Sequence, residues 1–132
     1  MEVRMDLARI IICETRDQHV IILRERNGAR ALPIVIGHTE AMAIDRRVKG
    51  EQPPRPMTHD LLGNVIDCLN AQLEKIVIND LQDRTFYAKL VIRQNTELVE
   101  IDSRPSDAIA LGVAGEVPIY VEDRVLREIS NN

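Results

Sequence analysis

The amino-acid sequence predicts an α+β domain in which helices pack on a mostly antiparallel sheet. Apolar, often β-branched segments follow one another with short polar turns between them, which is typical of antiparallel strands. A unit of three strands and one helix then occurs twice, since residues 32–36 and 40–44 match residues 98–101 and 107–111, with Glu40 opposite Asp107. The second copy has two extra residues between strand and helix, so the match suggests a duplication without proving it.

The first half of the chain is predicted to hold three strands and two helices. The strands are expected at residues 3–13, 20–23 and 31–36. Asn27-Gly28 is a hairpin signal between the second strand and the third. From Thr39 the apolar spacing becomes helical and ends at Gly50, a residue type common at helix C-termini. After a proline-rich loop, Thr58 is expected to cap a second helix.

The second half is predicted to repeat this pattern. Its strands are expected at residues 73–81, 85–93 and 97–102. Pro105 suits the first position of a helix because the amide hydrogen that it lacks would be unpaired there. This helix is expected to end near Gly115. A short strand at residues 118–121 and a final helical turn at residues 123–129 complete the chain.

The length of 132 residues indicates one domain, which we expect to cover residues 1–132. The sequence lacks a run of roughly eighteen apolar residues, and residues 1–6 lack the basic start of a signal peptide. We therefore expect neither a membrane segment nor export. Cys13 and Cys68 are isolated in the sequence, which favours reduced thiols and a cytoplasmic protein.

The charge balance bears on whether the protein binds nucleic acid. The net charge is −4, whereas proteins that hold nucleic acid unaided usually carry a basic surface. Three aromatic residues are too few for a row of base-stacking platforms. The one basic cluster, residues 46–49 followed by Arg55, could guide a phosphate backbone or could be a solvated helix face. These features argue against tight nonspecific binding.

Two carboxylates, a guanidinium and hydroxyls meet where the last long strand runs into the helix at Pro105. Asp102 ends the strand and Asp107 falls in the first helical turn, so both carboxylates could face one end of the sheet. Carboxylate oxygens suit Mg²⁺ or Mn²⁺, and Arg104 and Ser106 could hold phosphate. In the structural alternative, Asp107 and Ser106 cap the helix and Arg104 pairs with Asp102. In either case we expect Arg104 to pair with one of the two carboxylates, Asp102 or Asp107.

His59 and Asp60 form a second candidate in the first turn of the helix that Thr58 caps. An imidazole beside a carboxylate offers a metal ligand or a general base with an orienting partner. Arg55 lies just before this helix and could bind phosphate bidentately. The alternative is a capped helix in which Asp60 only compensates the helix dipole.

Three segments in this order resemble the signature of the bifunctional nuclease domain family: LPIVIG (residues 32–37) with Glu40-Ala41, RPMTHDLL (55–62) and IDSRPSDAIAL (101–111). The resemblance spans nearly the whole chain and implies nuclease activity on RNA and DNA. Phosphodiester hydrolysis usually needs metal ions held by carboxylates or histidines that transfer protons. We therefore predict a nuclease assisted by Mg²⁺ or Mn²⁺. Its expected catalytic residues are His59, Asp60, Asp102 and Asp107, of which Asp102 and Asp107 bind the metal, and its expected substrate-binding residues are Arg55, Arg104 and Ser106.

A different class of function stays open from the sequence. The charged junction could be a structural corner in a non-catalytic regulatory module or one that binds a small anion. The acidic charge balance and the few aromatic residues support this alternative. In either case, exposed strand edges and small size predict a homo-oligomer, either a dimer or a trimer.

Overall fold

Seven strands form one sheet in the computed structural model, which describes residues 1–13 and 15–130. In chain order the strands are β1 (Glu2–Ile11), β2 (His19–Glu25), β3 (Ala31–Ile36), β4 (Ala71–Gln82), β5 (Thr85–Gln94), β6 (Glu97–Ser103) and β7 (Ile119–Glu122). The helices are α1 (His38–Val48), α2 (Thr58–Cys68), α3 (Pro105–Val113) and α4 (Asp123–Ser130). The predicted α+β class is confirmed. Within the described ranges, no helix is long and apolar enough to span a membrane.

The strands lie in the order β3-β2-β1-β7-β4-β5-β6. Neighbouring strands are antiparallel except for β4 and β7, which run parallel. The short strand β7 joins the two halves of the sheet, because Val121 pairs with Val3 of β1 on one side and with Ile78 of β4 on the other. The prediction of a mostly antiparallel sheet is confirmed, whereas the position of β7 between the halves was not predicted.

Each half of the sheet leads into a helix in the same way. β1, β2 and β3 run from the centre to one edge and into α1, while β4, β5 and β6 run to the other edge and into α3. Glu40 is the third residue of α1 and Asp107 is the third residue of α3, so the two acids stand at equivalent helix starts. Superposition of the two halves, and with it the duplication, stays a prediction.

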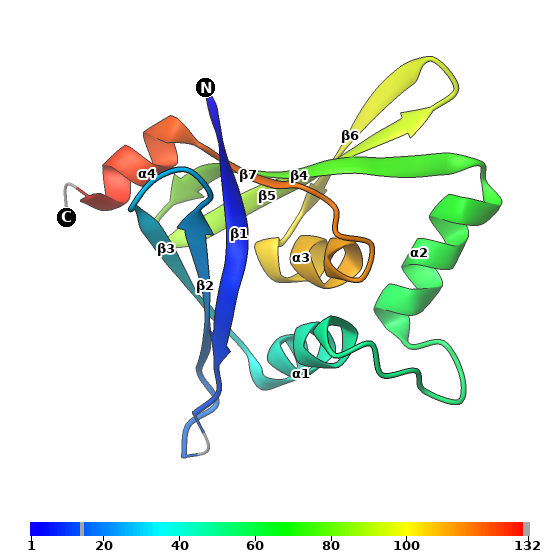
Figure 1. Ribbon diagram of the computed structural model, residues 1–132, viewed down its shortest axis with the longest axis horizontal. Helices are drawn as coiled ribbons and strands as arrows, with labels where there is room; N and C mark the ends of the chain where they lie inside the picture. Colours follow the sequence, from blue (N-terminus) through cyan, green and yellow to red (C-terminus); the bar gives the residue numbers. More distant parts are fainter. Residues whose placement is uncertain (14, 131–132) are drawn as a thin grey trace.

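The helix α3 provides a rigid base at the centre of the molecule. It lies next to α1 inside the bend of the sheet (Figure 1). From Pro105 to Gly112, every residue of α3 except Asp107 is buried. Gly112 is needed for the close approach of α3 to the sheet, because a Cβ atom there would lie 2.5 Å from Cδ1 of Ile76. The start of α3 is therefore fixed by core packing, and it presents Asp107 outward.

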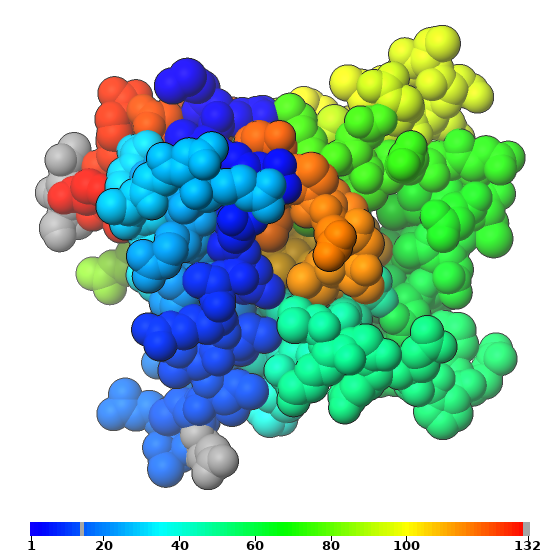
Figure 2. Space-filling view, viewed as in Figure 1, coloured from blue at the N-terminus to red at the C-terminus, as the bar shows by residue number. Residues whose placement is uncertain are grey.

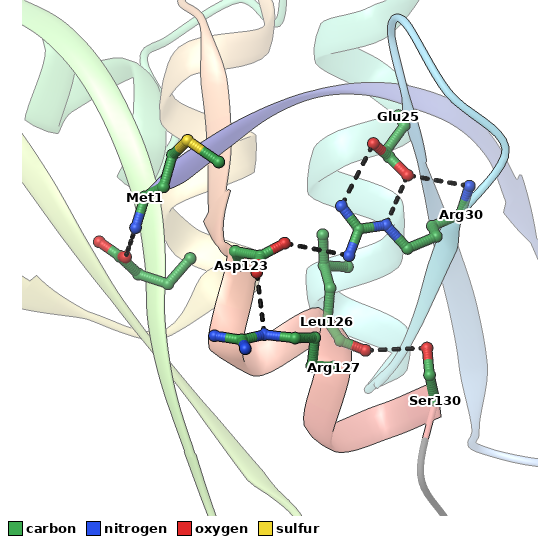
Figure 3. Close-up of polar contacts among 8 residues, drawn as sticks. Met1, Glu25, Arg30, Asp123, Leu126, Arg127 and Ser130 are labelled. Carbon is green, nitrogen blue, oxygen red and sulfur yellow. Dashed lines mark hydrogen bonds and ion pairs between the residues drawn. The ribbon is translucent and has the colours of Figure 1, made fainter.

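The C-terminal helix α4 is tied to the β2–β3 hairpin by ion pairs. The Arg30 guanidinium donates to Glu25 at 2.6 Å and to Asp123, the first residue of α4, at 3.1 Å (Figure 3). Nε of Arg127 lies 2.9 Å from the other oxygen of Asp123. The hydrogen bond from Arg30 lowers the pKa of Glu25 below its ordinary value. These contacts lie far from the predicted site and are structural.

The helix α2 differs from the other helices because none of its side chains is buried. It flanks the molecule beside α3 and β4 (Figures 1 and 2). Leu61 and Val65 of α2 and the adjacent Leu69 are largely exposed. An apolar helix that stays uncovered is unusual in a monomeric protein.

Candidate active site

A groove of about 650 Å³ separates α2 from the strands β5 and β6. Aliphatic side chains line most of its length, among them Leu62, Ile66, Leu90, Ile92, Val99 and Ile101. Polar residues border the groove where α2 and α3 begin: Thr58, His59, Asp102, Ser103, Arg104 and Asp107. The two segments with predicted catalytic residues therefore meet at one groove.

Asp107 and Arg104 form an ion pair at the start of α3. Arg104 precedes the helix with an extended backbone (φ −73°, ψ 146°), and Pro105 occupies the first helical position as predicted. Nε of Arg104 donates to Oδ2 of Asp107 at 2.9 Å, and Nη2 donates to Oδ1 at 3.2 Å. The prediction that Arg104 pairs with a carboxylate of this corner is confirmed, with Asp107 as the partner.

His59 reaches the same carboxylate from α2. Its Nε2 lies 3.0 Å from Oδ1 of Asp107, although the two residues are 48 positions apart in the chain. His59 is the second residue of α2, so the start of this helix sets the position of the imidazole. Facing an ionised carboxylate, Nε2 carries the hydrogen and Nδ1 is left as the nitrogen that can take a proton.

The Asp107 carboxyl is ionised at neutral pH. Burial raises its pKa, but the hydrogen bonds from Arg104 and His59 outweigh burial and hold the pKa below its ordinary value. In turn, Asp107 raises the pKa of Arg104. The arrangement is a histidine oriented by a carboxylate, with a guanidinium beside it that is 65% exposed and accessible to an anion.

Asp60 is turned to a different partner and holds the start of α2 in place. Its Oδ2 accepts a hydrogen bond from the backbone N–H of Met57 at 3.0 Å, which is the main cause of its lowered pKa. Its Oδ1 pairs with Arg47 of α1. Arg47 also donates to the backbone carbonyls of Ala110 and Leu111 in α3. Asp60 and Arg47 thus connect three helices and position His59.

Arg47 is a residue that the sequence analysis missed in this role. It belongs to the basic cluster that was interpreted as a phosphate guide or a solvated face, yet its side chain is only 13% exposed. The spacing of Arg46 and Arg47 on one helix gives no signal for a carboxylate that lies thirteen positions further along the chain.

The structure places Asp102 at the border of the groove. In the sheet register, Ile101 lies opposite Leu90, and Asp102 lies opposite Lys89. Successive side chains of a strand point to opposite faces, so Asp102 does not belong to the aliphatic wall that Ile101 forms, and it borders the groove only at its rim, where β6 ends. Its role as a metal ligand stays a prediction.

The remaining predicted residues lie around this centre. Ser106 is 5% exposed and borders a smaller cavity of about 380 Å³ on the other side of Arg104. Arg55 is exposed in the loop before α2 and borders neither cavity. Substrate binding by these residues stays a prediction. In the part of the chain that the structure describes, no group of three or more His, Cys, Asp or Glu side chains is arranged to hold a metal ion.

Comparison with known proteins identifies the family. A model of the bifunctional nuclease domain matches residues 21–132. An uncharacterized protein of Mycobacterium tuberculosis is 45% identical over 115 residues, which are 87% of this chain and 68% of that protein.

Bifunctional nuclease 2 of Oryza sativa subsp. japonica is 28% identical over 83% of this chain and 35% of its own length. Bifunctional nuclease 2 of Arabidopsis thaliana is 24% identical over 76% of this chain and 32% of its own length. The chain thus spans about a third of these plant proteins. On the family match and the mycobacterial relative together, the chain belongs to the bifunctional nuclease domain family.

Proposed function

We propose that this protein is a nuclease that hydrolyses phosphodiester bonds in RNA or DNA with the assistance of Mg²⁺ or Mn²⁺. The observation that carries the proposal is the contact of His59 and Arg104 with one carboxylate, Asp107, at the end of an open groove. The family supports the same class of reaction. Each of the three side chains has a chemical role in such a reaction.

His59 is the proton-transfer group of this proposal. Asp107 orients the imidazole through Nε2, so Nδ1 can take a proton from the attacking water. Arg104 is the phosphate-binding group, because its exposed guanidinium can exchange Asp107 for a phosphate and hold two oxygens at once. Asp60 acts through position, since it fixes the helix start that carries His59.

Asp107 and Asp102 would bind the metal ion. Mg²⁺ is commonly held by one or two carboxylates, with water and substrate phosphate oxygens as the other ligands. Asp102 and Asp107 both border the groove, which supports them as the proposed ligands. Movement of Arg104 to the phosphate would free Oδ2 of Asp107 for the cation, while Oδ1 keeps its contact with His59. Such an ion would supply Lewis-acid polarisation of the phosphoryl group.

Cleavage assays with purified protein test this proposal, using single-stranded RNA and DNA with and without Mg²⁺ or Mn²⁺. Asp107→Asn keeps the shape of the side chain but removes its charge. We expect cleavage to fall at least roughly tenfold, or about 1.4 kcal/mol of transition-state stabilisation, while the protein stays folded. Asp67→Asn is the matched control, because Asp67 is an exposed carboxylate of α2 that does not border the groove.

Three outcomes would change the proposal. Wild-type cleavage by a folded Asp107→Asn variant removes Asp107 from the catalytic residues. Reproducible cleavage in the presence of a chelator removes the metal ion. If the wild-type protein cleaves neither nucleic acid with either metal, the protein is not a nuclease, and a non-catalytic module that binds a small anion becomes the better explanation.

A further inference from the structure

A second cavity lies directly behind Arg104 and takes no part in the proposed chemistry. It measures about 380 Å³ and is formed by the end of β3, the start of α1, the β4–β5 hairpin and the start of α3. Arg104 borders both this cavity and the groove. A ligand whose phosphate sits on Arg104 could therefore extend into the second cavity.

Glu40 supplies an unsatisfied acceptor to this cavity. Its Oε2 is buried, and no residue in the described part of the chain donates a hydrogen bond to it. The carboxylate is folded against Gly37, where a Cβ atom would lie 3.0 Å from Oε1. A buried acceptor without a donor costs free energy, and a donor group of a ligand in this cavity would remove that cost.

Arg84 supplies a positive charge at the rim of the same cavity. It is exposed and lies in the β4–β5 hairpin with a left-handed backbone (φ 66°), as does Asp83 (φ 49°). Thr85 and Phe86 follow it along the cavity wall. The charged residues that line this cavity are Arg84, Arg104 and Glu40, and Arg104 is already paired with Asp107, so Arg84 is the arginine of the lining that the proposed site does not use.

We propose that this cavity binds the nucleotide next to the phosphodiester that is cleaved. Arg84 contacts the phosphate of that nucleotide, and Oε2 of Glu40 accepts a hydrogen bond from a hydroxyl or amino group of its nucleoside. Phe86 offers an aromatic surface to the base. This inference rests on the proposed nuclease function and specifies where its substrate lies.

Two measurements test the inference. Fluorescence anisotropy measures the binding of a labelled single-stranded RNA of twelve nucleotides, with a chelator present so that the RNA is not cleaved. Cleavage kinetics with the metal ion present give kcat and KM. We expect Arg84→Ala to weaken binding about tenfold and to lower the slope of log Kd against log salt by about 0.7, the loss of one phosphate contact. Glu40→Gln should raise KM about threefold or more and leave kcat unchanged, because a hydrogen bond to a charged acceptor is lost outside the reacting centre. Arg84→Lys should restore most of the salt slope, which a purely structural role would not predict.

Arg9→Ala is the matched control, because Arg9 is an exposed arginine of β1 that borders neither cavity. If the wild-type protein cleaves RNA or DNA while Arg84→Ala and Glu40→Gln keep its KM and salt slope, this inference is wrong and the nuclease function stands. If the wild-type protein neither binds nor cleaves, the nuclease function fails and this inference fails with it.

Discussion

A single carboxylate joins the two functional segments of this protein. Asp107 accepts hydrogen bonds from Arg104, three residues before it, and from His59 on another helix. The first contact is local, because it joins two residues three positions apart at the start of one helix. The second depends on the tertiary structure, because α2 must begin at the right place beside α3. The pairing of His59 with Asp107 is therefore the more informative contact.

The lowered pKa of Asp107 predicts how its contribution to stability depends on pH. Because Arg104 and His59 lower this pKa below the ordinary value of 3.8, the ionised carboxylate stabilises the folded protein. The contribution is complete at neutral pH, begins to fall near pH 3.8, and is lost once the pH is below the pKa in the folded protein.

Urea unfolding of the wild-type protein and Asp107→Asn, measured from pH 7 downward, checks this. We expect the variant to be less stable at pH 7 and the difference between the two proteins to shrink as the pH falls below about 4. Asp60 and Asp80, whose pKa values are also lowered, affect both proteins alike. A difference that stays constant down to the lowest pH would contradict the assignment.

At the scale of elements, one arginine contributes to the position of α2. The helix has no fully buried side chain, although its Ile66 packs against the core. Arg47 also joins α2 to the rest of the molecule, because one guanidinium contacts Asp60 and the carbonyls of Ala110 and Leu111. Removal of Arg47 would leave a carboxylate and two carbonyls without their donor.

We expect Arg47→Ala to lower the free energy of unfolding by about 2 kcal/mol, since breaking a largely buried ion pair leaves its partner uncompensated. Cleavage should also fall, although Arg47 lies outside the groove lining, because His59 loses its fixed position. Urea unfolding and cleavage assays measure the two effects. Lys49→Ala is the control, because the ion pair of Lys49 with Asp45 on the same helix is largely exposed. Its removal should change the free energy of unfolding and the cleavage rate much less. Equal effects of the two variants would show that Arg47 does not hold α2.

The elements themselves could be predicted from the sequence because each has a local signal. Pro105 marks the start of α3, and the alternation of Leu32, Ile34 and Ile36 marks β3, whose side chains are buried in that alternation. The prediction that Thr58 caps α2 is wrong by one residue, because Met57 is the N-cap and Thr58 is the first residue of the helix. Contacts between elements have no such signal. The pairing of β7 with β4 and the arginine that bridges three helices follow from how the layers pack, and spacing along the chain does not encode them.

At the scale of the whole molecule, the two edges of the sheet are unequal. The edge strand β3 carries Pro33, which cannot donate a backbone hydrogen bond and so discourages pairing with another strand. The other edge strand, β6, has no proline and exposes Leu98, Val99 and Ile101. α2 lies across the groove from it and exposes further apolar side chains. Exposed apolar surface of this kind, next to an unprotected strand edge, is typical of an interaction surface.

We propose that a second copy of the chain packs on Leu98 of β6 and Leu61 of α2, neither of which lines the groove, giving the expected dimer or trimer with the groove left open. Light scattering should then report a mass that is a multiple of the 15.0 kDa chain. Leu61→Glu places a charge on α2, and Leu98→Glu places one on β6. Each variant should shift the mass toward 15.0 kDa, because burial of an unpaired carboxylate at an interface is strongly unfavourable. Val35→Glu is the matched control, since Val35 is equally exposed but lies on β3 at the guarded edge, and it should leave the mass unchanged. A wild-type protein of 15.0 kDa at micromolar concentration would contradict the proposal, and dissociation by Val35→Glu alone would move the interface to the opposite edge.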